Sequence, residues 1–273
     1  MESTAIKAIA VFDIDGVVRD VGGSYRRALA DTVEHFTAGA YRPAVADIDV
    51  LKSEGIWNND WQASQELVYR YFESQGHSRK EITLDYETLV AFFQSRYRGP
   101  DSNIMTGYIC QEPVLIKPAY FTSLSQAGIL WGFFSGAMRD ECAYVLEGSL
   151  GLKKPLVIAM EDAPSKPDPT GLFATVEQLE HKHNCTAKVP VFYAGDTVAD
   201  MHVIREARKL KGDRSWEAVG VLPPHVLETP ERRDSYSATL KQAGAATVLN
   251  GMQELTPELI NKLLADRDRS LSV

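Results

Sequence analysis

From about residue 118 onward, short apolar runs alternate with longer stretches whose apolar residues have the spacing of an α-helix. Two of these helical stretches cover residues 168–181 and 197–211, and Asp168-Pro169 is predicted to supply the N-cap and first residue of the former. Repeated strand–helix units predict a parallel sheet with helices on both faces. The expected strands are the apolar runs 129–134, 156–160, 189–194, 218–222 and 247–249.

Residues 18–117 follow a different pattern. Segments 28–36, 61–72 and 86–97 have apolar residues three and four positions apart and contain few strand-like runs. We therefore predict an α/β protein with a Rossmann-like, doubly wound parallel sheet. Its core would comprise residues 1–17 and 118–273, with residues 18–117 inserted as an all-helical cap domain. Residues 223–235, which hold several prolines and charges, are expected to form a loop.

Composition excludes several classes of function. The 273 residues carry a net charge of −8, whereas a nucleic-acid or membrane-surface partner would require a basic face. The longest apolar stretch, 128–134, is far shorter than the roughly 18 residues of a membrane span. The three cysteines form neither a disulfide framework nor a CxxC zinc motif, so we expect them to be reduced, buried residues of a cytoplasmic protein.

The segment Asp13-Ile14-Asp15-Gly16-Val17 directly follows the apolar run 6–12, which we expect to be the first strand. Alternate residues of an extended segment share a face, so both carboxylates can point at one small molecule. One could attack while the other moves protons, provided that their surroundings separate their pKa values. A solvated acidic turn is an equally good interpretation of these five residues alone.

Two further motifs follow expected strands, whose carboxyl ends form the binding crevice of a doubly wound sheet. Ser135-Gly136 could bind an anion through the serine hydroxyl and backbone N–H groups, although Ser-Gly is also a common turn. Lys166 lies in a proline-rich loop that would fix a positive charge beside a phosphate. An exposed loop lysine is the alternative.

The segment from Gly195 to Asp200 carries two more acids, Asp196 at an expected strand end and Asp200 about one helical turn later. Both can face the same point, and oxygen ligands at this spacing suit Mg²⁺. In the alternative interpretation, Asp196 caps the helix and Asp200 is a solvated acid in its first turn.

Together and in this order, Asp-x-Asp-Gly-Val, Ser-Gly, Lys-Pro and Gly-Asp-x-x-x-Asp resemble the motifs of the haloacid dehalogenase superfamily. The resemblance covers nearly the whole chain and is to the branch with a helical cap after the first motif. It implies a magnesium-dependent phosphatase that acts on a small phosphorylated metabolite. Asp13 would be the nucleophile that forms an aspartyl-phosphate, and Asp15 the general acid and base. Relatives that cleave carbon–halogen or carbon–phosphorus bonds lack an acid at the position of Asp15, which therefore favours phosphoryl transfer involving oxygen.

The resemblance also implies a ligand set. Mg²⁺ would be held by the carboxylates of Asp13 and Asp196 and by the backbone carbonyl of Asp15, while Asp200 would bind directly or orient a coordinated water. Ser135, with Gly136 beside it, would bind a phosphoryl oxygen. Lys166 would neutralise charge on the phosphoryl group and on Asp13.

In relatives with this cap, a glycine-containing turn between two cap helices reaches the active site, and segment 54–61 matches it. Its Trp57, Asn58 and Asn59 are predicted to bind substrate by stacking and amide contacts. A helix N-cap at Asn59 or Asp60, flanked by core tryptophans, is an equally good interpretation.

Charged residues after the first motif, Arg19 and Arg26 among them, are expected to form a solvated hinge face, with contact to a second anionic group of the substrate as the alternative.

Two other functions stay open: a sugar phosphomutase, which would return the phosphoryl group to its substrate, and a non-catalytic phosphate-binding protein on the same fold. The sequence does not indicate an oligomeric state.

Overall fold

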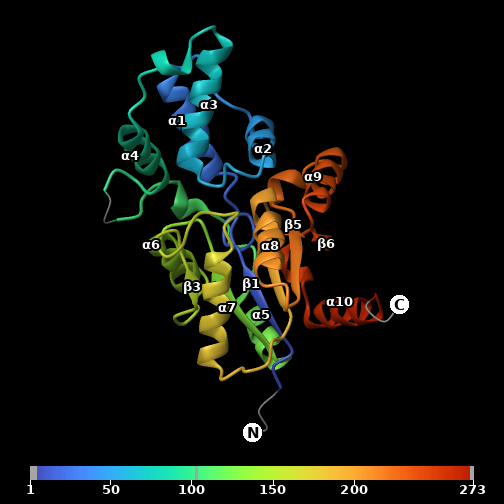
Figure 1. The fold of residues 1–273 in the computed structure, drawn as a ribbon. Coiled ribbons are helices and arrows are strands. Elements are labelled where there is room, and N and C mark those ends of the chain that lie inside the picture. Colours follow the sequence, from blue (N-terminus) through green and yellow to red (C-terminus); the bar gives the residue numbers. More distant parts are fainter. Residues whose placement is uncertain (1–4, 102–103, 271–273) are drawn as a thin grey trace. The chain divides into compact units, whose positions relative to one another are not determined.

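The computed structural model describes residues 5–101 and 104–270, and the chain divides into two compact units (Figure 1). The first unit comprises Met1–Asp20 and Val114–Val273, and the second comprises Val21–Pro113. These junctions differ by a few residues from the expected ones at 17/18 and 117/118. The shift has a structural reason: Leu115 N donates to Val18 O at 2.8 Å and Arg19 bridges Val114, so residues 18–20 remain with the first unit.

The first unit is built on a six-stranded parallel sheet with the strand order β3-β2-β1-β4-β5-β6. From the central strand β1 the chain moves outward to β2 and β3 and then returns to the other side of β1. The point beside β1 where the direction reverses is where ligands bind in sheets of this kind. The strands are β1 Ala8–Phe12, β2 Ile129–Phe134, β3 Val157–Ile158, β4 Val191–Gly195, β5 Trp216–Val221 and β6 Thr247–Leu249.

Helices cover both faces of this sheet, as predicted (Figure 1). Alternate residues of β1 enter two separate cores, because side chains of a strand point to opposite faces. Ala10 and Phe12 pack with α5 (Pro118–Gln126) and α10 (Pro257–Ser270). Ile9 and Val11, on the other face, pack with residues of three further helices. These helices are α7 (Thr170–Lys182), α8 (Val198–Leu210) and α9 (Pro230–Gln242).

Two local predictions in this unit are wrong. Helix α7 has Pro169 at its N-cap and begins at Thr170, one residue later than predicted, although Asp168 still accepts the Thr170 N–H at 2.8 Å. Segment 223–235 is not a loop throughout, because it contains a 3₁₀ turn, η4 (Pro224–Val226), and the start of α9. Thr229 caps α9 and Pro230 is its first residue, so this proline starts a helix rather than interrupting one.

The regular elements described in the second unit are helical: α1 Tyr25–Phe36, α2 Val45–Ser53, α3 Asp60–Ser74, η1 Arg79–Glu81, α4 Tyr86–Tyr97 and η2 Tyr108–Gln111. Its core lies between α1, α3 and α4 and includes Leu29, which is fully buried. Tyr25 of α1 meets the rings of Phe93 and Tyr97 edge-on, with centroids 5.2 and 4.5 Å apart. The first unit also contains α6 Arg139–Ala143, η3 Tyr144–Ser149 and η5 Met252–Glu254.

Within residues 5–101 and 104–270, no helix combines the length and apolar content that crossing a membrane requires. The three cysteines are free, but the expectation that all are buried is wrong. Cys142 is buried, Cys185 is partly exposed and Cys110 is exposed. Cys110 and Cys185 lie outside the strand-like apolar runs of the sequence, so the apolar pattern did not require either side chain to be buried.

Candidate active site

The candidate site lies at the carboxyl ends of β1, β2 and β4. The sheet register pairs Phe12 of β1 with Phe133 of β2 and with Ala194 of β4. Asp13, Ser135 and Asp196 follow these strands and therefore emerge at one edge of the sheet. The Asp13 N–H donates to the carbonyl of Ala194 at 2.9 Å, which continues the β1–β4 ladder up to the site.

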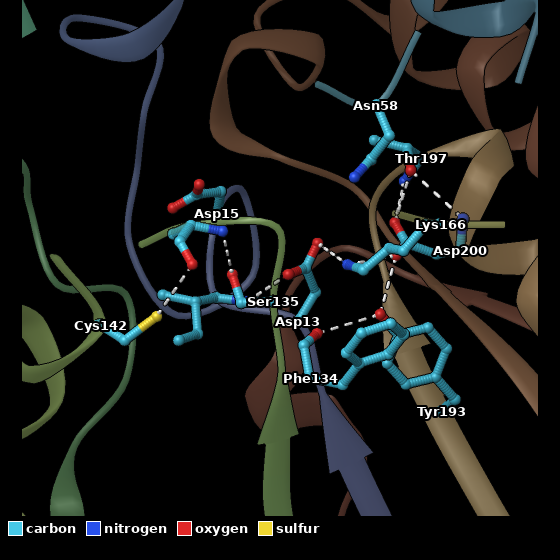
Figure 2. A network of polar contacts seen from close by, with 12 residues as sticks. Asp13, Asp15, Asn58, Phe134, Ser135, Cys142, Lys166, Tyr193, Thr197 and Asp200 are labelled. Atoms are coloured by element: carbon cyan, nitrogen blue, oxygen red, sulfur yellow. Dashed lines mark hydrogen bonds and ion pairs between the residues drawn. The ribbon is translucent and has the colours of Figure 1, made fainter. Parts of the chain in front are cut away.

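Lys166 joins two carboxylates at this edge (Figure 2). Its Nζ lies 2.8 Å from Asp13 Oδ2 and 2.8 Å from Asp200 Oδ1. All three residues are at least 95% buried. The rings of Phe134 and Tyr193 lie beside the ammonium group, with centroids 5.3 and 5.5 Å from Nζ. The alternative of an exposed loop lysine is therefore wrong.

Burial and charge separate the proton affinities of these groups. Burial raises the pKa of Asp13 to about 7, although Lys166 opposes the shift, and the nearby Asp200 charge raises the pKa further. Burial alone would also raise the pKa of Asp200, but Lys166 and hydrogen bonds from Thr197 outweigh it and the pKa lies below its usual value. For Lys166, burial favours the neutral form, yet the two carboxylates dominate and its pKa is raised. The single ammonium group of Lys166 thus lies between two buried carboxylates, those of Asp13 and Asp200.

Both oxygens of Asp200 are already engaged. Oδ1 accepts from the Tyr193 hydroxyl at 2.9 Å in addition to Lys166, and Oδ2 accepts from the Thr197 N–H at 2.9 Å and the Thr197 hydroxyl at 2.6 Å. Thr197, not Asp196, caps α8, and Asp200 is fully buried, so the alternative interpretation of this segment is wrong. Tyr193 and Thr197 were not predicted as site residues. The Thr-x-x-Asp spacing of a capping box was a usable signal for Thr197.

Asp13, Asp196 and Asp200 each offer an oxygen, and these three oxygens lie within 4.8 Å of one another. Asp196 is 5% exposed. Gly16 makes room for it: a Cβ at Gly16 would lie only 2.2 Å from Asp196 Oδ2. Gly195 does the same for Asp200, whose Cγ would lie 2.3 Å from a Cβ. The backbone is therefore shaped around a cluster of hard oxygen donors of the kind that Mg²⁺ prefers.

Gly16→Ala is expected to lower stability by about 2–3 kcal/mol, because it adds a clash to the cost of a positive φ. Gly16 has φ +73°, and its new methyl group would displace Asp196. Gly151→Ala is the matched control, since Gly151 has φ +71° but nothing within 4 Å of its Cβ position. Thermal unfolding of both variants separates the two contributions. Equal destabilisation would show that Asp196 does not require the space beside Gly16.

Asp15 does not contact Lys166 but is paired with an arginine. Arg19 Nε lies 2.5 Å from Asp15 Oδ1, and the Arg19 side chain is fully buried whereas that of Asp15 is 25% exposed. Arg26 is also buried and pairs with Asp49 at 2.6 Å. The expected solvated hinge face is therefore wrong for both arginines. Asp15 and Arg19 are four residues apart, but residues 15–19 form a turn and not a helix, so this spacing alone did not predict their contact.

Ser135 is buried at the end of β2, and its Oγ accepts the N–H of Ala137 at 3.2 Å. Because that bond uses a lone pair, the hydroxyl proton can be donated to another oxygen. Gly136 is half-buried in the same turn. Both predicted residues therefore lie at the edge that carries Asp13.

The predicted substrate-binding residues of segment 54–61 belong to the second unit. Asn59 Oδ1 accepts the N–H groups of Trp61 and Gln62 and caps α3, which matches the structural alternative for this residue. Trp57 Nε1 donates to Glu54 at 2.7 Å, and the carbonyl of Asn58 accepts from Lys52 at 3.1 Å. Substrate binding by Trp57, Asn58 and Asn59 stays a prediction.

No protein-family model matches the chain. Over 253 residues, which are 90% of this chain, it is 29% identical to a curated protein from Phytophthora nicotianae named imidazoleglycerol-phosphate dehydratase. The match covers 51% of that protein, so the chain spans about half the length of this relative.

Solved structures of low sequence identity share the fold. A phosphonoacetaldehyde hydrolase-like protein from Oleispira antarctica has a TM-score of 0.63 at 15% identity, covering 98% of this chain and 95% of its own. A haloacid dehalogenase-like protein of unknown function from Agrobacterium tumefaciens has a TM-score of 0.60 at 18% identity, covering 95% and 100%. A phosphatase from Thermococcus thioreducens has a TM-score of 0.57 at 21% identity, covering 78% and 92%. As the sequence motifs predict, the chain has the fold of the haloacid dehalogenase-like hydrolases.

Proposed function

We propose that this protein is a magnesium-dependent phosphatase that hydrolyses a small phosphomonoester through an aspartyl-phosphate on Asp13. The observation that carries the proposal is the buried contact of Asp13 with Lys166, beside two more carboxylates whose oxygens cluster with its own. A carboxylate that attacks a phosphate dianion is repelled unless cations intervene. This site offers one fixed ammonium group and the donor set for a divalent ion.

The residues present fit Mg²⁺. The carboxylates of Asp13 and Asp196 and the backbone carbonyl of Asp15 would hold the ion, and all three donors are hard oxygens. Asp200 would act indirectly, since its oxygens already accept from Lys166, Tyr193 and Thr197. When bound, the ion would offset negative charge on the phosphoryl group and on the attacking carboxylate.

In the first step, an oxygen of Asp13 bonds to phosphorus while the bond between phosphorus and the ester oxygen breaks. Asp15 gives its proton to that oxygen, so the leaving group departs as an alcohol. Lys166 balances charge on Asp13 and the phosphoryl group, and the hydroxyl of Ser135 donates to a phosphoryl oxygen.

In the second step, water attacks phosphorus and the bond to Asp13 breaks. The carboxylate of Asp15 takes a proton from that water, so inorganic phosphate is released and both aspartates return to their initial states. Because Asp13 is bonded to phosphorus between the two steps, a second acidic residue is needed to donate the proton in the first step and accept one in the second.

We also propose that the helical second unit is a cap that selects the substrate, with Trp57 and Asn58 as candidate contacts. The net charge of −8 favours a small metabolite over a nucleic acid or membrane surface, and we propose a cytoplasmic location. The name of the Phytophthora relative contains a phosphomonoester with an imidazole ring. Imidazole-bearing phosphomonoesters therefore belong among the first compounds to test.

Phosphate release from a panel of phosphomonoesters, measured with Mg²⁺ and then with chelator, tests the proposal. We expect turnover with Mg²⁺, a loss of at least about 100-fold with chelator, and recovery when Mg²⁺ is restored. Activity that is unaffected by chelator would contradict the metal assignment. An isomerised sugar phosphate with little free phosphate would indicate a mutase, and binding without turnover would indicate a phosphate-binding protein.

A further inference from the structure

We infer that Arg19 is a positioning residue for Asp15: it holds one carboxyl oxygen so that the other faces the leaving group of the substrate. The inference rests on the proposed function, which makes Asp15 the general acid. Arg19 itself would touch neither the substrate nor the phosphoryl group.

The contact between the two side chains carries the inference. Arg19 Nε donates to Asp15 Oδ1 at 2.5 Å, while the Arg19 side chain has no exposed surface and that of Asp15 keeps a quarter of its surface exposed. A fully buried arginine is rare because removing its charge from water is costly without compensating contacts. Asp15 is therefore held through one oxygen by a buried charged group, while part of its side chain stays accessible.

The backbone around the pair is fixed independently of the side chains. Gly16 N donates to Arg19 O at 3.0 Å, and Arg19 N donates to Ile14 O at 3.2 Å. Arg19 also forms bridges with Asp15 and Val114. Because the main chain is already held, the ion pair chiefly restricts rotation of the Asp15 carboxyl group.

That restriction matters at the moment of bond cleavage. A proton on Asp15 Oδ2 must reach the ester oxygen as the phosphorus–oxygen bond breaks, while Oδ1 accepts from Arg19 both before and after the transfer. A misplaced general acid loses much of its effect, because proton transfer requires hydrogen-bond contact with the leaving oxygen. The benefit of Arg19 should thus depend on how much the leaving group needs a proton.

Leaving-group dependence distinguishes positioning from a structural role. With Arg19→Met, we expect kcat/KM for glycerol 2-phosphate to fall about 100-fold, because an alkoxide needs the proton of Asp15. kcat/KM is compared for both esters because it reports the steps up to phosphorylation of Asp13 and excludes the later hydrolysis, which is common to both. For 4-nitrophenyl phosphate we expect a fall of less than about threefold, since its phenolate leaves without protonation. Arg19→Lys keeps a charged donor and should fall between Arg19→Met and wild type with glycerol 2-phosphate.

Arg214→Met is the matched control. Arg214 is also a largely buried arginine of the first unit, with Nη2 2.5 Å from Glu180 Oε1, but it precedes β5 at the opposite edge of the sheet. We expect it to leave the ratio of the two rates unchanged. Equal losses for both esters in Arg19→Met would overturn the inference. If Arg19→Met does not fold, the same ratio in Arg19→Lys decides.

Asp15→Asn separates failure of the inference from failure of the proposed function. It should itself lower the alkyl ester rate far more than the aryl ester rate, and adding Arg19→Met should cause no further loss. Additive losses in the double variant would show that Arg19 acts independently of Asp15. Equal losses for the two esters in Asp15→Asn alone would instead contradict the general-acid role of Asp15.

Discussion

Asp13→Asn is expected to lower kcat for phosphate release at least about 10³-fold. The amide group of asparagine is not a nucleophile toward phosphorus, so no phosphorylated protein can form. It also removes a carboxylate from the proposed Mg²⁺ site. The remaining groups cannot replace the missing attack, because the proposed roles of Lys166 and Ser135 are only to bind the phosphoryl oxygens and offset their charge.

The same change should leave the fold intact. Asp13 is 95% buried and its pKa is about 7, so burial already disfavours its charged form. Asparagine has nearly the same shape and carries no charge that must be removed from water. Lys166 also keeps Asp200 as a partner. A loss of activity can therefore be assigned to chemistry.

Phosphate release, thermal unfolding and the mass of acid-quenched protein check this prediction together. The wild-type protein should show a mass increase of one phosphoryl group during turnover, and Asp13→Asn should not. Asp213→Asn, which removes an exposed carboxylate at the surface, is the control and should keep full activity. Turnover by Asp13→Asn above a tenth of the wild-type rate would exclude Asp13 as nucleophile.

The sheet was largely predictable from sequence because its inner strands are buried on both faces. A buried parallel strand is a continuous apolar run, and the expected run 129–134 coincides with β2. The expected run 247–249 also coincides with β6, although this edge strand is only partly buried. The position of the four motifs could then be predicted as well, because each comes after a strand and parallel strands bring their carboxyl ends to one edge of the sheet. Asp13, Lys166 and Asp200 lie 153 and 34 residues apart in sequence, yet this topology places them in contact.

The contacts around these motifs were not predictable by the same argument. Arg19 was expected to be solvated, since a charged side chain after a turn is usually exposed, but its side chain is fully buried and pairs with Asp15. Tyr193 looks like any apolar strand residue until its hydroxyl meets Asp200. Likewise, Pro230 gave a loop signal although it begins α9. The partners of Arg19 and Tyr193 are only four and seven residues away, but no regular helix or strand brings either pair together, and Pro230 has two common uses.

Lys166→Met is expected to destabilise the protein by about 3–5 kcal/mol in the presence of chelator. The substitution leaves Asp13 and Asp200, whose side chains are 7% and 0% exposed, without their shared counter-charge. Carboxylates in such a site either remain charged at high cost or take up protons, and both outcomes lower stability at neutral pH. Urea unfolding with a fixed chelator concentration measures the change.

Lys188→Met is the control for removal of an ion-paired lysine. Lys188 and Asp213 are both more than 60% exposed, so water already screens their charges and the unfolding midpoint should not change measurably. A similar small effect for Lys166→Met would mean that the folded protein does not hold two charged carboxylates around this lysine.

Mg²⁺ makes this prediction diagnostic for catalysis as well as stability. A divalent ion on Asp13 and Asp196 should recover part of the stability that Lys166→Met loses, because it compensates the same buried charge. Activity should stay at least about 100-fold below wild type, since the ion cannot also take the place of the ammonium group beside Asp13 and the phosphoryl oxygens. If Mg²⁺ restored activity along with stability, Lys166 would be a structural counter-ion, and one cation would be sufficient for the attack of Asp13.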